Sequence, residues 1–89
     1  MRFENKRVAV TGAAGNLGQA VAKAFLAEGA NIVAIDRVQA TIDGTDASRV
    51  EARVIDLTDA AATLAAFDSI GAVDVLCNVA GGFDMGTPV

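Results

Sequence analysis

The sequence contains one cysteine, few basic residues and neither histidine nor tyrosine, and these shortages exclude several classes of function. Cys77 alone cannot form an internal disulfide, so nothing indicates an oxidising compartment and we expect a cytoplasmic protein. The seven lysine and arginine residues are scattered, and the net charge is −4. Nucleic acids and acidic membranes require a basic face, so we expect neither as a partner.

The missing histidine and tyrosine also limit the catalytic groups. The only lysines are Lys6 and Lys23, and the only serines are Ser48 and Ser69. No acid–base pair of defined geometry can be assembled from them, so we assign neither catalytic residues nor metal ligands. The first seven residues are polar and precede only a short apolar run, which is typical of neither a signal peptide nor a membrane anchor. We expect Met1 to be a natural start.

Apolar residues, by contrast, are abundant. They make up 53% of the 89 residues, and the mean hydropathy is +0.43. A chain of this length buries only about 60–65% of the surface that it exposes when unfolded. This mismatch indicates part of a larger domain. Because repeats, low-complexity tracts and linkers are missing, we expect residues 1–89 to belong to one domain.

The first half of the chain has the pattern of a βαβ unit. Residues 7–11 and 31–36 are short, mostly apolar runs typical of buried parallel strands. Residues 16–28 predict a helix with Gly29 as its left-handed carboxyl-terminal cap. The residues at helical spacing in that helix are Leu17, Val21, Ala24, Phe25 and Glu28.

The second half predicts two further strands and a helix. Residues 37–49 indicate a loop with at most one helical turn, long enough for a parallel crossover, although Asp43-Gly44 leaves a hairpin open as an alternative. Residues 50–56 alternate apolar with charged side chains over their first five positions, as expected for a marginal strand. Thr58 is a plausible helix N-cap. The helix covers about 59–69, with Ala60, Leu64, Phe67 and Gly71 at helical spacing, and residues 73–79 form an interior strand.

The turn between the first strand and first helix carries three glycines with different steric uses. Gly12 permits a tight exit from the strand, Gly15 lets the backbone approach an anion, and Gly18 lets the helix pack closely on the sheet. Backbone N–H groups near Asn16 and Leu17 then face phosphates at the positive end of the helix dipole. This context favours a pyrophosphate-binding turn for a nicotinamide dinucleotide.

Asp36 ends the second strand, 18 residues beyond Gly18. Its carboxylate can accept hydrogen bonds from adenosine ribose hydroxyls, and it would repel a 2′-phosphate. The repulsion is on the order of 4 kcal/mol per unit charge at about 4 Å. NAD is therefore expected in preference to NADP, although Arg37 can soften this preference; a solvated carboxylate that merely ends a strand is the alternative.

With these residues the chain resembles the amino-terminal part of a short-chain dehydrogenase/reductase. Thr11–Gly18 resembles the family's Thr-Gly-x-x-x-Gly-x-Gly turn, Asp56-Leu57 matches its adenine-binding Asp and apolar residue, and Asn78-Val79-Ala80-Gly81 resembles its Asn-Asn-Ala-Gly motif. The resemblance implies an α/β fold: a partial, doubly wound Rossmann-type parallel sheet of four strands in the order 3-2-1-4. It also implies that Asp56 contacts the adenine amino group and Leu57 offers its N–H. Asn78, Ala80 and Gly81 would line the ribose and the approach to the nicotinamide.

Two positions depart from the family pattern. Asn16 replaces the middle glycine, which gives the spacing of an epimerase-like and regulatory branch, whereas Asn78-Val79-Ala80-Gly81 favours the shorter dehydrogenase branch. Val79 replaces the second Asn and removes an amide. For Asp56 a role as a cap or dipole partner of the helix near Asp59 can coexist with adenine binding. Cys77 is interpreted as a small buried side chain.

The family's catalytic Ser, Tyr and Lys have no counterparts in this sequence. The resemblance therefore implies the cofactor-binding portion of an NAD-dependent oxidoreductase that interconverts an alcohol and a carbonyl compound, with the catalytic part outside residues 1–89. The chain alone is expected to be inactive, and a complete protein is expected to form a homodimer or homotetramer. A silent dinucleotide-binding regulator and an autonomous nucleotide-binding mini-domain are the alternatives.

Overall fold

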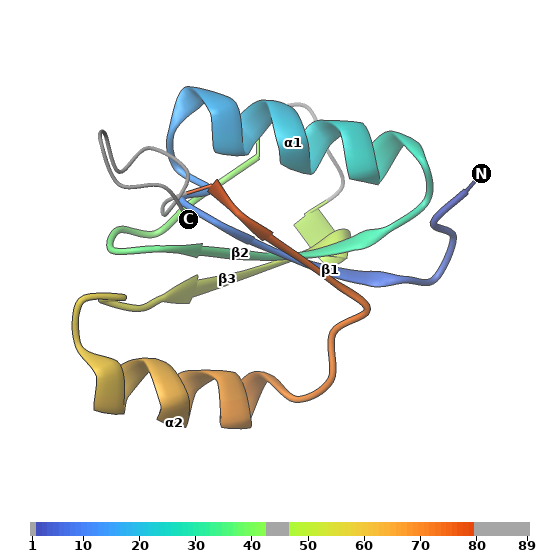
Figure 1. Cartoon of the computed structure of the whole chain (residues 1–89). Helices are drawn as coiled ribbons and strands as arrows, with labels where there is room; N and C mark the ends of the chain where they lie inside the picture. The colour runs from blue at the N-terminus through green and yellow to red at the C-terminus, as the bar shows by residue number, and fades with distance from the viewer. Residues whose placement is uncertain (1, 43–46, 80–89) are drawn as a thin grey trace.

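In the part of the chain that the structure describes, a parallel sheet carries one α-helix on each face (Figure 1). The structure, a computed structural model, describes residues 2–42 and 47–79. Its elements in chain order are β1 (Arg7–Thr11), α1 (Asn16–Ala27), β2 (Asn31–Asp36), the 3₁₀ turn η1 (Ala47–Arg49), β3 (Val50–Val54), α2 (Ala60–Ile70) and β4 (Val75–Asn78). The expected α/β class is confirmed, and no helix in the described ranges is long and apolar enough to cross a membrane.

The strand order is β3-β2-β1-β4, which confirms the predicted order 3-2-1-4. β1 lies between β2 and β4, and its last residue, Thr11, pairs in register with Ile35 on one side and Asn78 on the other. The carboxyl ends of these three strands therefore meet at one edge. Parallel sheets of this kind bind ligands at the carboxyl ends of two neighbouring strands whose following connections run to opposite sides of the sheet.

β2 and β3 pair in parallel, with Ile32 opposite Val50 and Asp36 opposite Val54. A hairpin would make these strands antiparallel, so the hairpin alternative is wrong. Asp43 and Gly44, the residues that suggested it, lie outside the described residues. The single helical turn expected in this connection is η1.

Two apolar clusters cover the two faces of the sheet. In β1, Val8 and Val10 join the cluster beneath α1, whereas Ala9 joins the cluster that includes Ile70 of α2. β1 and β2 are buried on both faces, which explains why their sequences are almost continuously apolar. β3 is half-buried and lies at the edge, as its alternating sequence predicts.

The buried face of α1 differs from the predicted stripe. Gly18, Ala22 and Leu26 are buried, whereas Leu17 is 49% exposed. Phe25 is half-buried and meets the Phe3 ring edge-on, with 4.9 Å between ring centroids. Hydrophobicity alone suggested Leu17, but the small residues are those that allow the helix to approach the sheet.

The ends and buried face of α2 also differ from expectation. Asp59, not Thr58, is the N-cap, and its carboxylate accepts a hydrogen bond from the Ala62 N–H at 3.0 Å. Leu64 is 74% exposed. Ile70 is buried instead, and Ala66 and Phe67 pack against the second cluster. Gly29, by contrast, has the positive φ of 90° predicted for the cap after α1.

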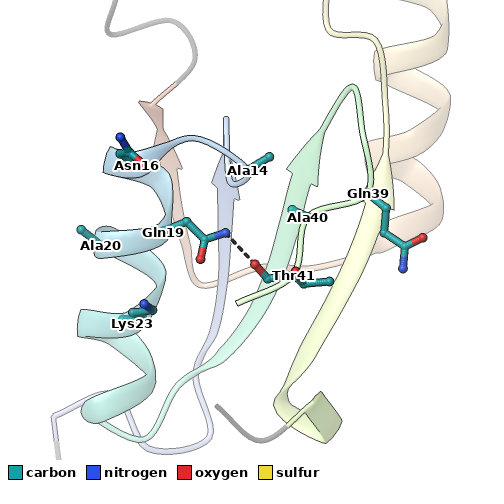
Figure 2. Close-up of a pocket in the computed structure, with 8 residues that line it drawn as sticks. All are labelled: Ala14, Asn16, Gln19, Ala20, Lys23, Gln39, Ala40 and Thr41. Atoms are coloured by element: carbon teal, nitrogen blue, oxygen red, sulfur yellow. Dashed lines mark hydrogen bonds between the residues drawn. The ribbon is translucent and has the colours of Figure 1, made fainter. Parts of the chain in front are cut away.

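The segment after β2, residues 37–42, is irregular but anchored. Ala40 and Ile42 are 3% and 7% exposed and belong to the cluster beneath α1. The side-chain amide of Gln19 on α1 donates to the Thr41 carbonyl at 2.6 Å (Figure 2). Residues 37–42 contain no helix, and the buried side chains of Ala40 and Ile42 cover the part of the sheet that a crossover helix would otherwise cover.

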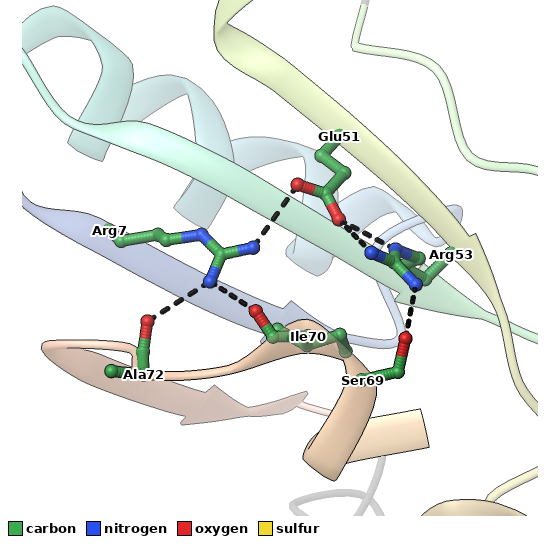
Figure 3. Close-up of polar contacts among 6 residues, drawn as sticks. All are labelled: Arg7, Glu51, Arg53, Ser69, Ile70 and Ala72. Carbon is green, nitrogen blue, oxygen red and sulfur yellow. Dashed lines mark hydrogen bonds and ion pairs between the residues drawn. The ribbon is translucent and has the colours of Figure 1, made fainter. Parts of the chain in front are cut away.

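Arg7 joins β1 to the end of α2 and to β3 (Figure 3). Its guanidinium donates to the carbonyls of Ile70 and Ala72 and to Glu51 Oε1, the last at 3.1 Å. Arg53 also binds Glu51, with 2.6 Å between Nε and Oε2. The hydrogen bond from Arg53 is the largest influence lowering the pKa of Glu51, with Arg7 adding to it against the opposing effect of burial.

We predict that Glu51→Gln will lower the free energy of unfolding at neutral pH, because two arginines lose their anionic partner. The lowered pKa of Glu51 stabilises the fold above the ordinary value near 4.5, and this contribution is lost as the pH falls through the lowered value. Urea denaturation over a pH series will measure it. The difference in the free energy of unfolding between Glu51→Gln and wild type should become smaller in acid. The matched control Asp68→Asn on α2 should differ little from wild type at any pH. A gap of constant size from neutral to acidic pH would contradict the assignment.

Candidate functional site

The glycine turn that links β1 to α1 is held against β2. Gly12 has a positive φ of 69°, a conformation that side chains disfavour, so the chain can turn sharply out of β1. The Ala13 N–H donates to the Ile35 carbonyl at 3.1 Å, and the Gly15 N–H donates to the Gly12 carbonyl at 3.2 Å. The turn is therefore closed on itself and fixed to the neighbouring strand.

Gly15 and Gly18 face different surroundings. A Cβ at Gly18 would lie 2.8 Å from Ala13 Cα and closer still to the Gly12 carbonyl oxygen, a separation that real Cβ atoms do not show. A Cβ at Gly15 would make only ordinary contact, 3.6 Å from the same oxygen. The packing of α1 therefore requires glycine at 18, whereas the protein itself leaves room at 15.

The amino end of α1 faces outward from this turn. Gly15 is its N-cap, and no side-chain cap bonds it. The first helical hydrogen bond joins the Gln19 N–H to the Gly15 carbonyl at 2.9 Å. Asn16 and Leu17 are exposed, so an anion can approach their amide groups at the positive end of the helix dipole.

Asp36 lies beside the turn rather than projecting into solvent alone. It is half-buried at the end of β2, and its carboxylate accepts hydrogen bonds from the Ala14 N–H at 3.0 Å and the Arg37 N–H at 2.7 Å. The acid singled out in the sequence is thus bonded directly to the glycine turn.

Asp56 follows β3 and shapes the turn into α2. Its Oδ1 accepts hydrogen bonds from the Thr58 hydroxyl at 2.6 Å and the Thr58 N–H at 3.0 Å. These bonds, first from the hydroxyl and then from the N–H, lower the pKa of Asp56, and the charge of Arg37 lowers it further. Asp56 therefore stays ionised, and Asp59 rather than Asp56 caps α2.

A pocket of about 300 Å³ joins these residues at the carboxyl ends of the strands. Five residues singled out in the sequence line it, together with two that sequence reasoning missed. The predicted ones are Gly12, Asp36, Arg37, Asp56 and Leu57, and the missed ones are Ile55 and Thr58. Ile55 is buried, and its N–H donates to the Asp36 carbonyl at 2.9 Å. It follows Val54 directly and so breaks the alternation of apolar and charged residues in β3, which is the signal that could have found it.

The remaining predicted residues lie farther along the same edge or outside the described part. The Oδ1 of Asn78, at the end of β4, accepts a hydrogen bond from the buried Thr11 hydroxyl at 2.8 Å. Ala80 and Gly81 lie outside the described residues. Cys77 is half-buried, and burial raises the pKa of its thiol, which disfavours the reactive thiolate.

Known proteins resemble this chain along nearly all of its length. The family model for short chain dehydrogenases matches residues 6–88. L-xylulose reductase of Bos taurus is 39% identical over 80 residues, which cover 88% of this chain and 33% of that protein. Meso-2,3-butanediol dehydrogenase of Serratia marcescens is 38% identical over 89 residues, which cover 91% and 36%, respectively.

A solved structure extends the comparison. The crystal structure of a short chain dehydrogenase from Leptospira borgpetersenii with bound NAD⁺ aligns with a TM-score of 0.68 and 26% identity, over 78% of this chain and 27% of that one. The chain thus spans about a third of the length of the curated relatives named above.

The steric contrast between the two glycines gives a direct prediction. Gly18→Ala should destabilise the protein by about 1–3 kcal/mol, because α1 must move away from the turn to admit the methyl group. Gly15→Ser should leave stability unchanged or slightly raised, because its Cβ fits and serine is a good N-cap. Urea denaturation followed by circular dichroism measures both, and equal stability of the two variants would contradict the packing argument.

Proposed function

Because the chain belongs to the short-chain dehydrogenase family, we propose that it is the amino-terminal, NAD(H)-binding portion of a single Rossmann domain. The complete protein would be an NAD-dependent oxidoreductase that interconverts an alcohol and a ketone or aldehyde on a small molecule. The reductase and dehydrogenase names of its relatives support this activity.

The observation that carries the proposal is the bond between Asp36 and the Ala14 N–H at 3.0 Å. It places the candidate ribose-binding acid next to the candidate pyrophosphate-binding turn. In a dinucleotide the pyrophosphate is attached to the 5′ carbon of the adenosine ribose. The groups that bind the pyrophosphate and the 2′- and 3′-hydroxyls must therefore be adjacent in its site. Neither a generic anion site nor an isolated surface carboxylate needs this juxtaposition.

The residues present fit the adenosine half of the cofactor. The backbone near Gly15, Asn16 and Leu17 would receive the pyrophosphate, where the open space at Gly15 admits it. The pocket of about 300 Å³ would receive adenine between the apolar side chains of Ile55 and Leu57, with the Asp56 carboxylate accepting from its amino group. Gly18 contributes indirectly by allowing the helix to approach.

The nicotinamide end would extend toward β4. Asn78, Ala80 and Gly81 would line the second ribose and the approach to the ring, and Thr11 would orient Asn78 through their hydrogen bond. The bound cofactor supplies the hydride acceptor or donor. The residues of this chain bind and orient it, and proton transfer requires groups that its sequence lacks.

The charge of Asp36 favours NAD over NADP. A 2′-phosphate beside the carboxylate would be repelled, while Arg37 offers a partly compensating charge. The NAD⁺ bound to the Leptospira structure supports the same choice. We also propose a cytoplasmic location and a dimeric or tetrameric complete protein.

A catalytically silent dinucleotide-binding regulator remains the second candidate. Asn16 at the place of a glycine favours it, and the Asn78-Val79-Ala80-Gly81 segment opposes it. The coding sequence beyond Val89 separates the two. We expect it to encode a Ser and then Tyr-x-x-x-Lys, whereas their absence would favour the regulator.

The cofactor preference gives a testable prediction at Asp36. Asp36→Asn keeps an oxygen acceptor for the Ala14 N–H but removes the charge. It should weaken NAD⁺ binding by about tenfold, equivalent to about 1.4 kcal/mol, and reduce the ratio of NAD⁺ affinity to NADP⁺ affinity. Isothermal titration calorimetry measures both affinities.

Asp68→Asn is the matched control, because it removes one charge from the exposed side of α2. It should leave both affinities unchanged. Identical NAD⁺ and NADP⁺ affinities for Asp36→Asn and wild type would overturn the assignment of Asp36 to the ribose.

A further prediction concerns activity. The 89-residue polypeptide should bind NAD⁺ without reducing it in the presence of small diols and sugar alcohols, because its sequence has no tyrosine or histidine for proton transfer. Absorbance of NADH follows the reaction. Turnover by the purified polypeptide would show that another group performs the proton transfer.

A further inference from the structure

The side-chain amide of Gln19 lies between the glycine turn and the segment after β2 (Figure 2). Its Nε2 donates to the Ala13 carbonyl at 3.0 Å and to the Thr41 carbonyl at 2.6 Å. Both partners are carbonyl oxygens, which only accept, so the amide nitrogen must face them. One side chain of α1 therefore joins two loops that are 28 residues apart in sequence.

The bond to Ala13 holds the glycine turn from the helix side. The Ala13 N–H is already bonded to the Ile35 carbonyl, and the Ala14 N–H to the Asp36 carboxylate. Two consecutive residues of the turn are thus bonded to β2, and one of them, Ala13, is also bonded to α1. The hydrogen bond from α1 comes from the side chain of Gln19, which donates to the Ala13 carbonyl.

The bond to Thr41 holds the other loop. Residues 37–42 contain neither helix nor strand. Burial of Ala40 and Ile42 anchors two side chains, and Gln19 anchors the backbone between them. This segment continues directly from Asp36 and Arg37, which line the proposed adenosine pocket.

We propose that Gln19 is a positioning residue for dinucleotide binding, acting through the carbonyls of Ala13 and Thr41. This inference rests on the proposed function. Gln19 fixes the separation between the turn that would hold the pyrophosphate and the segment that follows the ribose-binding acid. Loss of its amide should therefore weaken binding of NAD⁺ and of ADP-ribose alike, since both carry the adenosine diphosphate portion.

A second pocket, of about 600 Å³, surrounds this amide and supplies a matched control. Gln39, which is exposed, lines the same pocket as Gln19. Gln39→Glu introduces the same charge there without removing the two hydrogen bonds. Lys23, one turn along α1, is the charged residue among those that line this pocket, and the Asp36 carboxylate accepts from the Ala14 N–H, next to the Ala13 that Gln19 contacts.

The main test compares Gln19→Glu with Gln39→Glu in the full chain. An ionised carboxylate at position 19 cannot donate and faces two carbonyl oxygens, so we expect NAD⁺ and ADP-ribose to bind at least about tenfold more weakly near pH 8. Below about pH 5 the carboxyl becomes protonated and can donate one hydrogen bond, so part of the affinity should return relative to wild type at the same pH. Gln39→Glu should follow wild type at both pH values.

A second measurement is independent of the cofactor. Amide hydrogen exchange of the ligand-free chain should show faster exchange at Ala13, Ala14 and Gly15 in Gln19→Glu and in Gln19→Met, a neutral variant of similar length. Exchange in β1 and β2 should stay slow, which separates a loosened turn from general unfolding. Unchanged exchange in the turn of a folded Gln19→Met variant would overturn the proposal, whether or not any cofactor binds.

The outcomes also separate the two proposals. Absence of NAD⁺ and ADP-ribose binding by wild type would contradict the proposed function, and the positioning role for binding would fall with it. Binding by wild type that Gln19→Glu and Gln19→Met both retain in full would leave the proposed function intact and overturn the role of Gln19. If Gln19→Glu regained affinity for NAD⁺ and ADP-ribose in acid and Gln19→Met did not, the role of the hydrogen-bond donor would be supported.

Discussion

The close approach of α1 to the glycine turn at Gly18 is the contact on which the candidate site depends. Any Cβ at that position would collide with the backbone of Gly12 and Ala13. Because the helix can come this near, its amino end lies directly over the edge where β1 ends, and Gln19 reaches the Ala13 carbonyl. If a methyl group at position 18 pushed the helix away, both the direction of the helix dipole and this hydrogen bond would change.

Hydrogen bonds at the carboxyl ends of the strands join residues from separate strands into one connected arrangement. Asp36 bonds to Ala14, the Ile55 N–H bonds to the Asp36 carbonyl, and Asp56 organises the following turn through Thr58. The first two bonds join the end of β2 to the turn after β1 and to the residue after β3, and the third lies within the turn that leads into α2. The pocket is therefore formed by backbone positions as much as by side chains, which suits a family that binds a shared cofactor with variable sequences.

The sequence predicted the sheet because its signals are local and strong. Uninterrupted apolar runs identify β1 and β2, and glycines at 12, 18 and 29 occupy positions where the backbone requires them. The helix faces were harder, because α1 and α2 are rich in alanine and their hydrophobicity hardly distinguishes one side from another. Leu17 and Leu64 looked like core residues and are exposed, since Gly18 and Ile70 set the actual rotation of the helices.

The site was partly predictable for a related reason. Asp36 and Asp56 follow strands, and parallel strands bring such residues to one edge, so their meeting could be expected. Gln19 and Thr58 could not be found this way, because their roles depend on contacts with Thr41 and Asp56 that only the folded loops create. Their residue types are ordinary for a helix surface and a turn.

The position of β4 has a consequence for how the site assembles. β1, β2 and β3 come from the first 54 residues, whereas the Asp74 side chain that accepts from the Arg7 N–H is 67 residues away in sequence. Closing this longer loop costs more chain entropy than forming the βαβ unit. The pocket of about 300 Å³ uses only loops from the three earlier strands and the start of the turn into α2. During synthesis, we therefore expect this pocket to take shape before the strand that carries Asn78 joins the sheet.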